Sequence, residues 1–220
     1  LAASGAKVLH LRCVEYARRF NLPIHVRSSF SNLEGTWIVQ DHPEGADDME
    51  QAIISGIAHD KSEAKITIVG VPDRTGVAAR IFQAIADSSI NIDMIVQNVS
   101  AAATGLTDIS FTLPKSDGAE ATVLLKEIQG EIGFASLLYD DQVGKLSLVG
   151  AGMRSHPGVT ATFFACLADA GLNIEMISTS EIRISVIVRD SDLDKGVRAA
   201  HTAFELDTDD EAVVYGGSGR

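Results

Sequence analysis

Residues 66–100 read ITIVGVPDRTGVAARIFQAIADSSINIDMIVQNVS, and residues 146–180 repeat the same pattern as LSLVGAGMRSHPGVTATFFACLADAGLNIEMISTS. A shift of 82 positions places Gly76 on Gly158 and aligns the Asn-Ile-acid-Met-Ile phrase that follows in each stretch. Self-similarity at a fixed period of this kind indicates that the chain contains two copies of one structural unit.

Each copy runs through strand and helix patterns in the same order. In the first copy, Ala78, Phe82 and Ile85 recur at positions i, i+4 and i+7, which is typical of the apolar stripe of an amphipathic helix. The order strand, helix, strand, strand, helix, strand is that of a ferredoxin-like βαββαβ unit, so we predict an α+β fold with two such units in tandem. In the first copy, the predicted strands lie at 65–70, 90–99, 107–113 and 136–139; one predicted helix starts at 78 and the other covers 121–128. In the second copy, the predicted strands lie at 146–150, 173–178, 183–189 and 212–215, and the predicted helices cover 159–170 and 193–204.

The segment before the repeats predicts a helix, a short strand and a linker. Apolar residues from Val8 to Ala17 recur at every third position, as in a helix, and residues 22–26 have the β-branched bias of a strand. Residues 41–51 read DHPEGADDMEQ and contain proline, glycine and five acidic residues, which favours a linker, and residues 53–58 predict a further strand. These patterns divide the chain into an upstream segment at 1–40, a linker at 41–52, a first unit at 53–140 and a second unit at 141–220.

Composition and charge exclude several classes of function. The 220 residues are 45% hydrophobic with a mean hydropathy of +0.14, which predicts a packed, soluble protein. The formal net charge of −12 argues against a nucleic-acid partner, because such proteins gather Lys and Arg on one face. No apolar run approaches the roughly 18 residues of a membrane span, and the two cysteines lack the spacing of a disulfide framework or a zinc site. We therefore expect a cytoplasmic protein without a membrane or nucleic-acid partner.

The two strand–loop–helix junctions, at 69–78 and 149–160, are the candidate binding sites. A glycine at the start of each helix lets the backbone approach a ligand, and the free N–H groups of a first helical turn attract an anion such as a carboxylate. An α-amino acid supplies that anion, and its ammonium group would need acceptors such as Asp73 and Gln97. The alternative is that Gly76 and its counterpart only begin a helix beside a turn, but their presence in both copies favours a binding role.

Residue types that could support catalysis are not arranged for it. The six histidines do not share metal-ligand spacing, which argues against a zinc enzyme. His156 lies between Ser155 and Pro157 in the second junction, where it would either touch a ligand or remain a solvated loop residue. The chain has no GxxxxGK[ST] motif and no GxGxxG motif after a strand. From the residues alone, we predict no metal site and no catalytic centre.

The repeated phrases resemble the paired ACT domains of the aspartate kinase family. The resemblance is carried by ITIVGVPDRTGVAARIF, NIDMIVQNVS, SHPGVTATFF, NIEMISTSEIRISV and EAVVYGGSGR, and it covers about residues 53–220. Upstream, SGAKVLHLRCVEYARRFNLPIHVRSSF resembles the last helix and strand of that family's α/β amino-acid-kinase catalytic domain, whose GAKVLH phrase contributes a lysine to the ATP site. The resemblance therefore implies that Lys7 binds ATP, and we expect Leu1 to lie within a domain rather than at its beginning.

The family phosphorylates the side-chain carboxylate of aspartate with ATP, the first step toward lysine, threonine and methionine. Its ACT pair binds end-product amino acids between subunits and inhibits the kinase. The resemblance thus implies threonine and lysine as effectors, and a homodimer through the ACT domains or an assembly with a catalytic subunit. The phrase after Met49 also resembles the start of a separately made regulatory subunit. Because the family's N-terminal lysine and glycine-rich phosphate-binding motif is absent, we expect this chain alone to be inactive as a kinase; a stand-alone amino-acid-sensing module is the alternative.

The resemblance also assigns residues to two effector pockets. A threonine-type pocket would lie between one ACT unit and the Asn-Ile phrase of a partner copy. Its residues are Asp73, Gly76, Val77, Ala78 and Gln97 of one copy with Asn173 and Ile174 of the other. Further candidates, for a lysine-type pocket, are Asp93, Ser155, His156, Gly158, Ser180 and Glu181.

Overall fold

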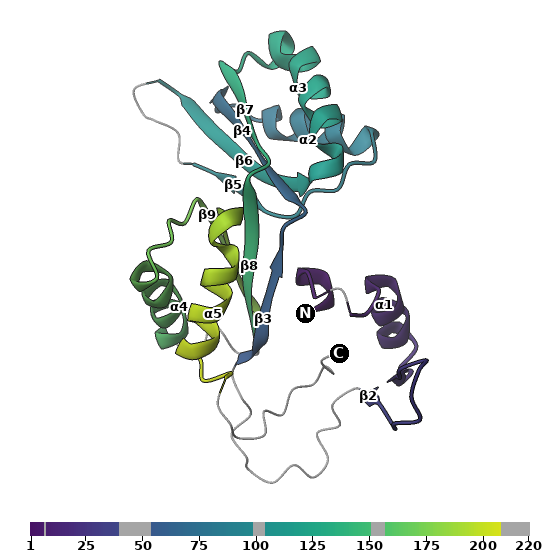
Figure 1. Ribbon diagram of the computed structural model, residues 1–220. Coiled ribbons are helices and arrows are strands. Elements are labelled where there is room, and N and C mark those ends of the chain that lie inside the picture. The colour runs from purple at the N-terminus through teal and green to yellow at the C-terminus, as the bar shows by residue number, and fades with distance from the viewer. Residues whose placement is uncertain (7, 40–53, 99–103, 151–156, 208–220) are drawn as a thin grey trace.

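The structure, a computed structural model, consists of two α/β units and a smaller N-terminal segment (Figure 1). It describes residues 1–6, 8–39, 54–98, 104–150 and 157–207. Each unit has a four-stranded antiparallel sheet with two helices on one face. The predicted α+β fold with two ferredoxin-like units is thereby confirmed.

The first unit begins with a long strand whose alternate residues point into its core. Ile66 and Ile68 are fully buried under the helices, and Phe82 packs edge-on against Phe111 at a ring-centroid distance of 5.7 Å. The sheet order is β5-β6-β4-β7, so the two central strands carry most of this core. The elements are β4 (Glu63–Pro72), α2 (Val77–Asp87), β5 (Ile95–Gln97), β6 (Leu106–Pro114), η2 (Lys115–Asp117), α3 (Gly118–Ile132) and β7 (Ser136–Asp140).

The second unit repeats this arrangement around its own core. Phe163 and Val186 are fully buried in it, and Gly144 lies directly beneath Leu193. A Cβ at Gly144 would come 2.7 Å from Cδ2 of Leu193, so the glycine allows the last helix to lie close to the sheet. The elements are β8 (Val143–Gly150), α4 (Pro157–Asp169), β9 (Met176–Thr179), β10 (Arg183–Arg189), η4 (Asp190–Asp192) and α5 (Leu193–Ala203).

One strand belongs to a different unit from the one predicted. The sequence assigned the strand at 53–58 to the first unit, but β3 (Ile54–Asp60) pairs with β8 in the sheet β3-β8-β10-β9. The physical reason is that β6 and β7 already occupy both sides of β4, whereas one side of β8 is free to accept β3. β3 thus takes the place beside β8 that β7 takes beside β4. The predicted closing strand at 212–215 and the linker at 41–52 lie outside the described residues.

The chain crosses between the units twice, through short turns. Lys61 and Ser62 connect β3 to β4, and the backbone N–H of Ser62 donates to Oδ1 of Asp60 at 2.8 Å. Asp141 and Gln142 connect β7 to β8. Because neither connection is longer than two residues, the two sheets are held close together at these turns.

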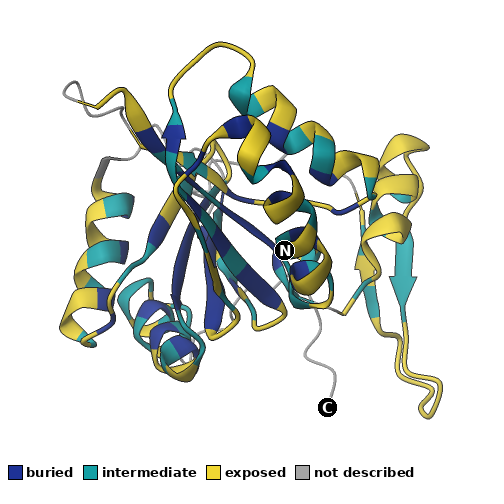
Figure 2. Ribbon diagram, turned by 90° about the horizontal axis from the view of Figure 1, so that it is seen from above, coloured by how far each residue is buried: buried dark blue, intermediate teal, exposed yellow. Residues whose placement is uncertain are grey.

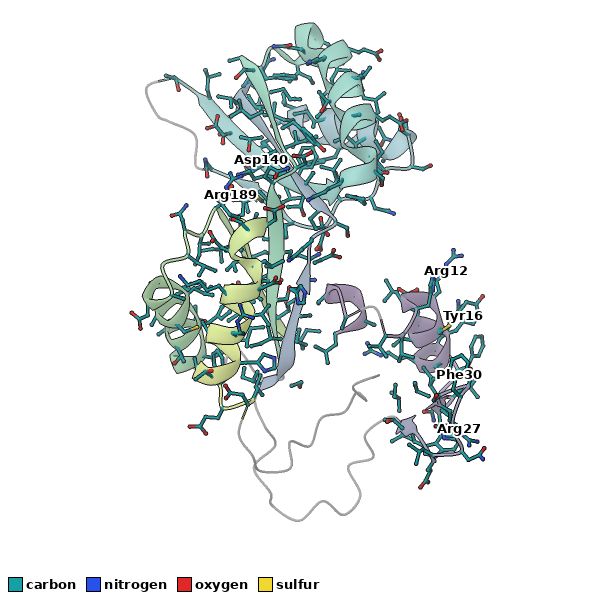
Figure 3. All side chains as sticks on the ribbon, in the orientation of Figure 1. Arg12, Tyr16, Arg27, Phe30, Asp140 and Arg189 are labelled. Carbon is teal, nitrogen blue, oxygen red and sulfur yellow. The ribbon has the colours of Figure 1, made fainter. Side chains whose placement is uncertain are left out.

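The N-terminal segment contains the predicted helix and strand and one strand that was not predicted. Figure 2 shows that buried residues gather in the two sheets and their helices, whereas this segment is mostly exposed or intermediate. The side chain of Phe30, which is 99% exposed, and that of Tyr16 point outward (Figure 3). A hollow of about 310 Å³ lies between the helix and the hairpin and is lined in part by Val14, Ile24 and Ile38. The elements are η1 (Ala2–Ser4), α1 (Leu11–Arg19), β1 (Ile24–Val26) and the unpredicted β2 (Thr36–Ile38).

Candidate functional site

The loop between β4 and α2 forms the candidate site of the first unit. The backbone N–H of Asp73 donates to the carbonyl of Gly105 at 2.9 Å, and that of Val77 donates to the carbonyl of Arg74 at 3.2 Å. Gly76 is the N-cap residue of α2 and has a φ of 92°. This left-handed conformation favours glycine over residues with a side chain.

The space around Gly76 is open. A Cβ built on Gly76 would meet no atom within 4 Å, so close packing is not the reason for a glycine here. As glycine has no side chain that could cap the first turn of α2, a bound anion can approach this helix end. Asp73 is exposed beside it, and Val77 and Ala78 are half-buried. The four residues predicted for this part of the pocket are therefore brought together.

A residue that the sequence did not single out anchors the strand that leads into this loop. Oδ1 of Asp108 accepts a hydrogen bond from the backbone N–H of Gly70 at 2.8 Å, where β4 bulges between Ile68 and Val71. Gly70 has a φ of 68°, and a Cβ there would come 3.0 Å from Cβ of Ala135. No pattern in one sequence marks this aspartate, because its role depends on pairing between distant strands.

The other predicted pocket residues lie farther from this loop. Gln97 is exposed in β5 and pairs in register with Ile109, two strands away from β4. Asn173 and Ile174 precede β9 in the second unit, where Ile174 packs against that unit's own core. Within the described residues of one chain, no hydrogen bond links them to Asp73. Completion of the pocket by a second copy stays a prediction.

The second junction is described only in part. Ser155 and His156 lie outside the described residues, as does Lys7, which was assigned to ATP. Gly158 lies in the first turn of α4, where it is exposed and where an added Cβ would meet no atom within 4 Å. Ser180 lies in the turn after β9, and its backbone N–H donates to the carbonyl of Arg183 at 2.7 Å; Glu181 is exposed in the same turn.

Asp93, predicted for the lysine-type pocket, is engaged in ion pairs between the units. Its Oδ2 lies 2.6 Å from Nζ of Lys145 and its Oδ1 3.4 Å from Nη2 of Arg183. Burial alone would raise the pKa of Asp93, but the hydrogen bond and charge of Lys145, together with Arg183, outweigh it and hold that pKa below its ordinary value. Burial likewise opposes the charge of Lys145, yet its bonds to Asp93 and Glu63 raise its pKa overall. An effector at Asp93 would have to share or displace these partners.

The sequence analysis did not predict a role for the two lysines of this interface, Lys65 and Lys145. A signal was present, because each interrupts an otherwise apolar strand at equivalent repeat positions, in KITIVG and KLSLVG. A lysine repeated inside a buried strand indicates a paired charge.

Other kinds of site have no counterpart in the described part of the chain. There, no three His, Cys, Asp or Glu side chains gather as metal ligands. The described helices include none with the length and apolar character that a bilayer crossing requires.

The repeats match a known family. Residues 66–128 and 146–204 match the ACT domain family. The aspartokinase of Mycolicibacterium smegmatis is 58% identical over 223 residues, which cover all of this chain and 52% of that protein. The aspartokinase of Mycobacterium tuberculosis (strain H37Rv) is 59% identical, with the same coverage. The chain thus spans about half the length of these curated relatives.

Solved structures agree with this match. The crystal structure of aspartokinase alpha and beta subunits is 48% identical, with a TM-score of 0.65, over 70% of this chain and 99% of that one. The regulatory subunit of aspartate kinase from Thermus thermophilus is 39% identical, with a TM-score of 0.66, over 69% of this chain and 99% of that subunit. The two repeated units are therefore ACT domains, and the chain belongs to the aspartokinase family, of which it represents the regulatory region.

Proposed function

We propose that this chain regulates an aspartate kinase by binding threonine, lysine or both. The observation that supports this most directly is the open, left-handed Gly76 at the N-terminus of α2, with an equally open glycine, Gly158, at the start of α4. Because the N-terminus of a helix attracts anions, these two open helix ends favour two sites for the carboxylates of amino acids.

In the proposed threonine pocket, different groups bind different parts of the amino acid. The backbone around Gly76 and Val77 receives the α-carboxylate, where the helix dipole favours negative charge. Asp73 and Gln97 supply acceptors for the ammonium and hydroxyl groups. Asn173 and Ile174 of a partner copy close the pocket, which makes dimerisation part of the proposal. The lysine-type pocket uses the equivalent junction of the second unit.

The catalytic part of the proposal concerns the whole protein rather than this region. We propose that the complete enzyme transfers phosphate from ATP to the side-chain carboxylate of aspartate in the cytoplasm, with Lys7 at the ATP site, and that this chain alone is inactive. Inhibition then requires the effector to bind the inactive arrangement more tightly than the active one. The alternative, a sensing module without a kinase, has less support, because the relatives are aspartokinases of about twice this length.

Calorimetric titration tests the effector assignment. Threonine and lysine are titrated into the chain separately and then together, with D-threonine as a control of the same composition. We expect L-threonine to bind and to raise the thermal midpoint, as any ligand that prefers the native state does. The proposal would be overturned if neither threonine nor lysine bound, and equal binding of D-threonine would argue against a specific pocket.

A further inference from the structure

The interface between the two ACT units contains two ion pairs that are equivalent under the repeat. Lys65 of β4 pairs with Glu175, which precedes β9. Lys145 of β8 pairs with Asp93, which precedes β5, at 2.6 Å. The lysines are 80 positions apart and the acids 82, so each lysine reaches from one repeat to the same acid of the other repeat.

The Lys65–Glu175 pair and the side chain of Lys145 are largely shielded from water, whereas the side chain of Asp93 is 32% exposed. The side chains of Lys65 and Glu175 are 18% and 12% exposed, and that of Lys145 is 3% exposed. Lys145 also lies 2.8 Å from Oε1 of Glu63, whose second oxygen is buried without a hydrogen-bond partner within the described chain. Ion pairs at such low exposure are much less screened by salt than surface pairs.

Two arginines of β10 add further ion pairs at the interface between the units. Nε of Arg189 lies 2.8 Å from Oε1 of Glu175, and its Nη2 lies 2.6 Å from Oδ2 of Asp140 at the end of β7. Figure 3 shows Asp140 and Arg189 meeting where the two units join. On the other side, Arg183 approaches Asp93 at 3.4 Å. Glu175 and Asp93 therefore each have one lysine partner and one arginine partner.

A small apolar cluster joins the two units in addition to the charged groups. Met94 and Met176, which directly follow Asp93 and Glu175, are buried there with Val143 and Ile187. Apolar side chains alone would hold two sheets together at least as well, since replacing a buried ion pair by hydrophobic residues is often neutral or stabilising. The charges are thus better explained by the particular positions that they impose than by added stability.

The two acids directly follow the Asn-Ile phrases of the repeats, which are the candidate effector residues Asn173 and Ile174 in the second unit and their equivalents, Asn91 and Ile92, in the first. The backbone N–H of Glu175 donates to the carbonyl of Ile187 at 2.8 Å, and that of Asp93 donates to the carbonyl of Thr112 at 3.1 Å. Each acid is thus fixed by its backbone to its own sheet and by its side chain to the other unit. Glu175 directly follows Asn173 and Ile174, so any shift of that phrase also acts on the ion pair.

We infer that Lys65 and Lys145 are positioning residues, each of which holds the Asn-Ile effector-binding phrase of the other repeat in its binding position. This inference rests on the proposed function, because it assumes that the phrase contacts an amino-acid effector. Lys65 acts through Glu175 on Asn173 and Ile174, and Lys145 acts through Asp93 on the equivalent phrase of the first unit. Neither lysine needs to touch the effector.

Threonine titration of variants of the whole chain tests the inference. Lys65→Met removes the charge and Lys65→Arg keeps it. Lys61→Met is the matched control, because Lys61 lies in the turn between β3 and β4 and forms an exposed pair with Asp194. We expect Lys65→Met to weaken threonine binding about tenfold, which corresponds to about 1.4 kcal/mol. Lys65→Arg should recover most of the affinity, and Lys61→Met should bind like the wild type.

The outcomes separate the inference from the proposed function. Circular dichroism establishes that each variant is folded at the temperature of titration. If Lys65→Met does not fold, Glu175→Gln replaces it, because it keeps the size of the side chain and is expected to show the same loss. A wild type that binds threonine, together with a folded variant of equal affinity, overturns the inference alone. A wild type that binds no effector overturns the proposed function and the inference with it.

Discussion

Gly196 of α5 lies so close to Leu172 that a Cβ at position 196 would come 2.7 Å from Cδ2 of the leucine. Leu146 and Leu167 approach the same point at 3.2 and 3.5 Å, so the helix is seated on three leucines of the second core. Because all three are buried, none can move aside without disturbing the packing around it.

Gly196→Ala is therefore expected to destabilise the protein. Overpacking of a core lowers the free energy of unfolding by about 1–3 kcal/mol, whereas the better helix propensity of alanine raises it by about 1 kcal/mol at most. Urea unfolding should give a lower midpoint for this variant. The control is Gly130→Ala in α3, where an added Cβ meets no atom within 4 Å. This control should be more stable than the wild type by about 0.5–1 kcal/mol; stabilisation by both changes would contradict the proposed packing.

Gly76→Ala is expected to affect both stability and effector binding. A left-handed backbone costs a residue with a side chain about 1–2 kcal/mol, and the new methyl group occupies the open space over the start of α2. Gly158→Ala is the matched control, because Gly158 is equally open but has no left-handed φ. Thermal melts and threonine titration should show losses for the first variant, while the second should melt no lower than the wild type. A Gly76→Ala protein that binds threonine normally would exclude this helix end from the pocket.

Loss of stability in acid is expected to depend on Asp93 and Asp140. Burial opposes the charge of Asp93, but Lys145 and Arg183 lower its pKa overall; the hydrogen bond from Arg189 lowers the pKa of Asp140. A lowered pKa in the folded state gives stability that is present above the ordinary value of 3.8 and is lost as the pH falls through the folded value.

Urea unfolding between pH 5 and the acid limit, about pH 2, measures this loss. Stability should fall mainly below pH 4, the region of unperturbed aspartate pKa values, which lie at about 3.9. Asp93→Asn should flatten the fall while lowering stability at pH 7. An unchanged pH profile for this variant would mean that the ion pairs at the interface do not contribute to acid sensitivity.

A buried pair of hydroxyl groups in the second sheet offers a separate test. Oγ of Ser147 lies 2.8 Å from Oγ of Ser185, and neither serine is exposed to solvent. Ser147→Ala should cost about 1–3 kcal/mol, because it leaves a buried hydroxyl without this partner. The double variant Ser147→Ala/Ser185→Ala should lose less than the sum of the two single changes. The equivalent pair of the first unit, Thr67 and Ser110, is half-buried and should show a smaller coupling.

The repeat made most of the architecture predictable. Shared apolar patterns predicted the order of elements in both units, because the alternation of residues such as Ile66 and Ile68 reflects burial of one face of a strand. The partner of β3 could not be predicted in this way. Its apolar pattern is compatible with burial in either sheet, and its true place depends on which edge the other strands leave free.

The candidate site was predictable only where one segment supplies it. The loop from Asp73 to Ala78 is local, and its glycine is visible in the sequence. The partners of Asp108 and of the two lysines lie about 40 to 110 positions away, so a local pattern can mark the lysines but cannot identify the groups that they pair with. The ion pairs were missed for a further reason, since a lysine in a strand is usually taken to face solvent.

The placement of β3 has a mechanical consequence. Because β3 precedes the first unit in the chain but completes the sheet of the second, the first unit is an insertion within the second. A pull on the chain ahead of β3 would load the β3–β8 ladder before it reached any part of the first unit. The second unit is thus the one that first senses tension from the N-terminal side, and it can pass a displacement to the first through the two short turns, the paired charges and the apolar side chains between them.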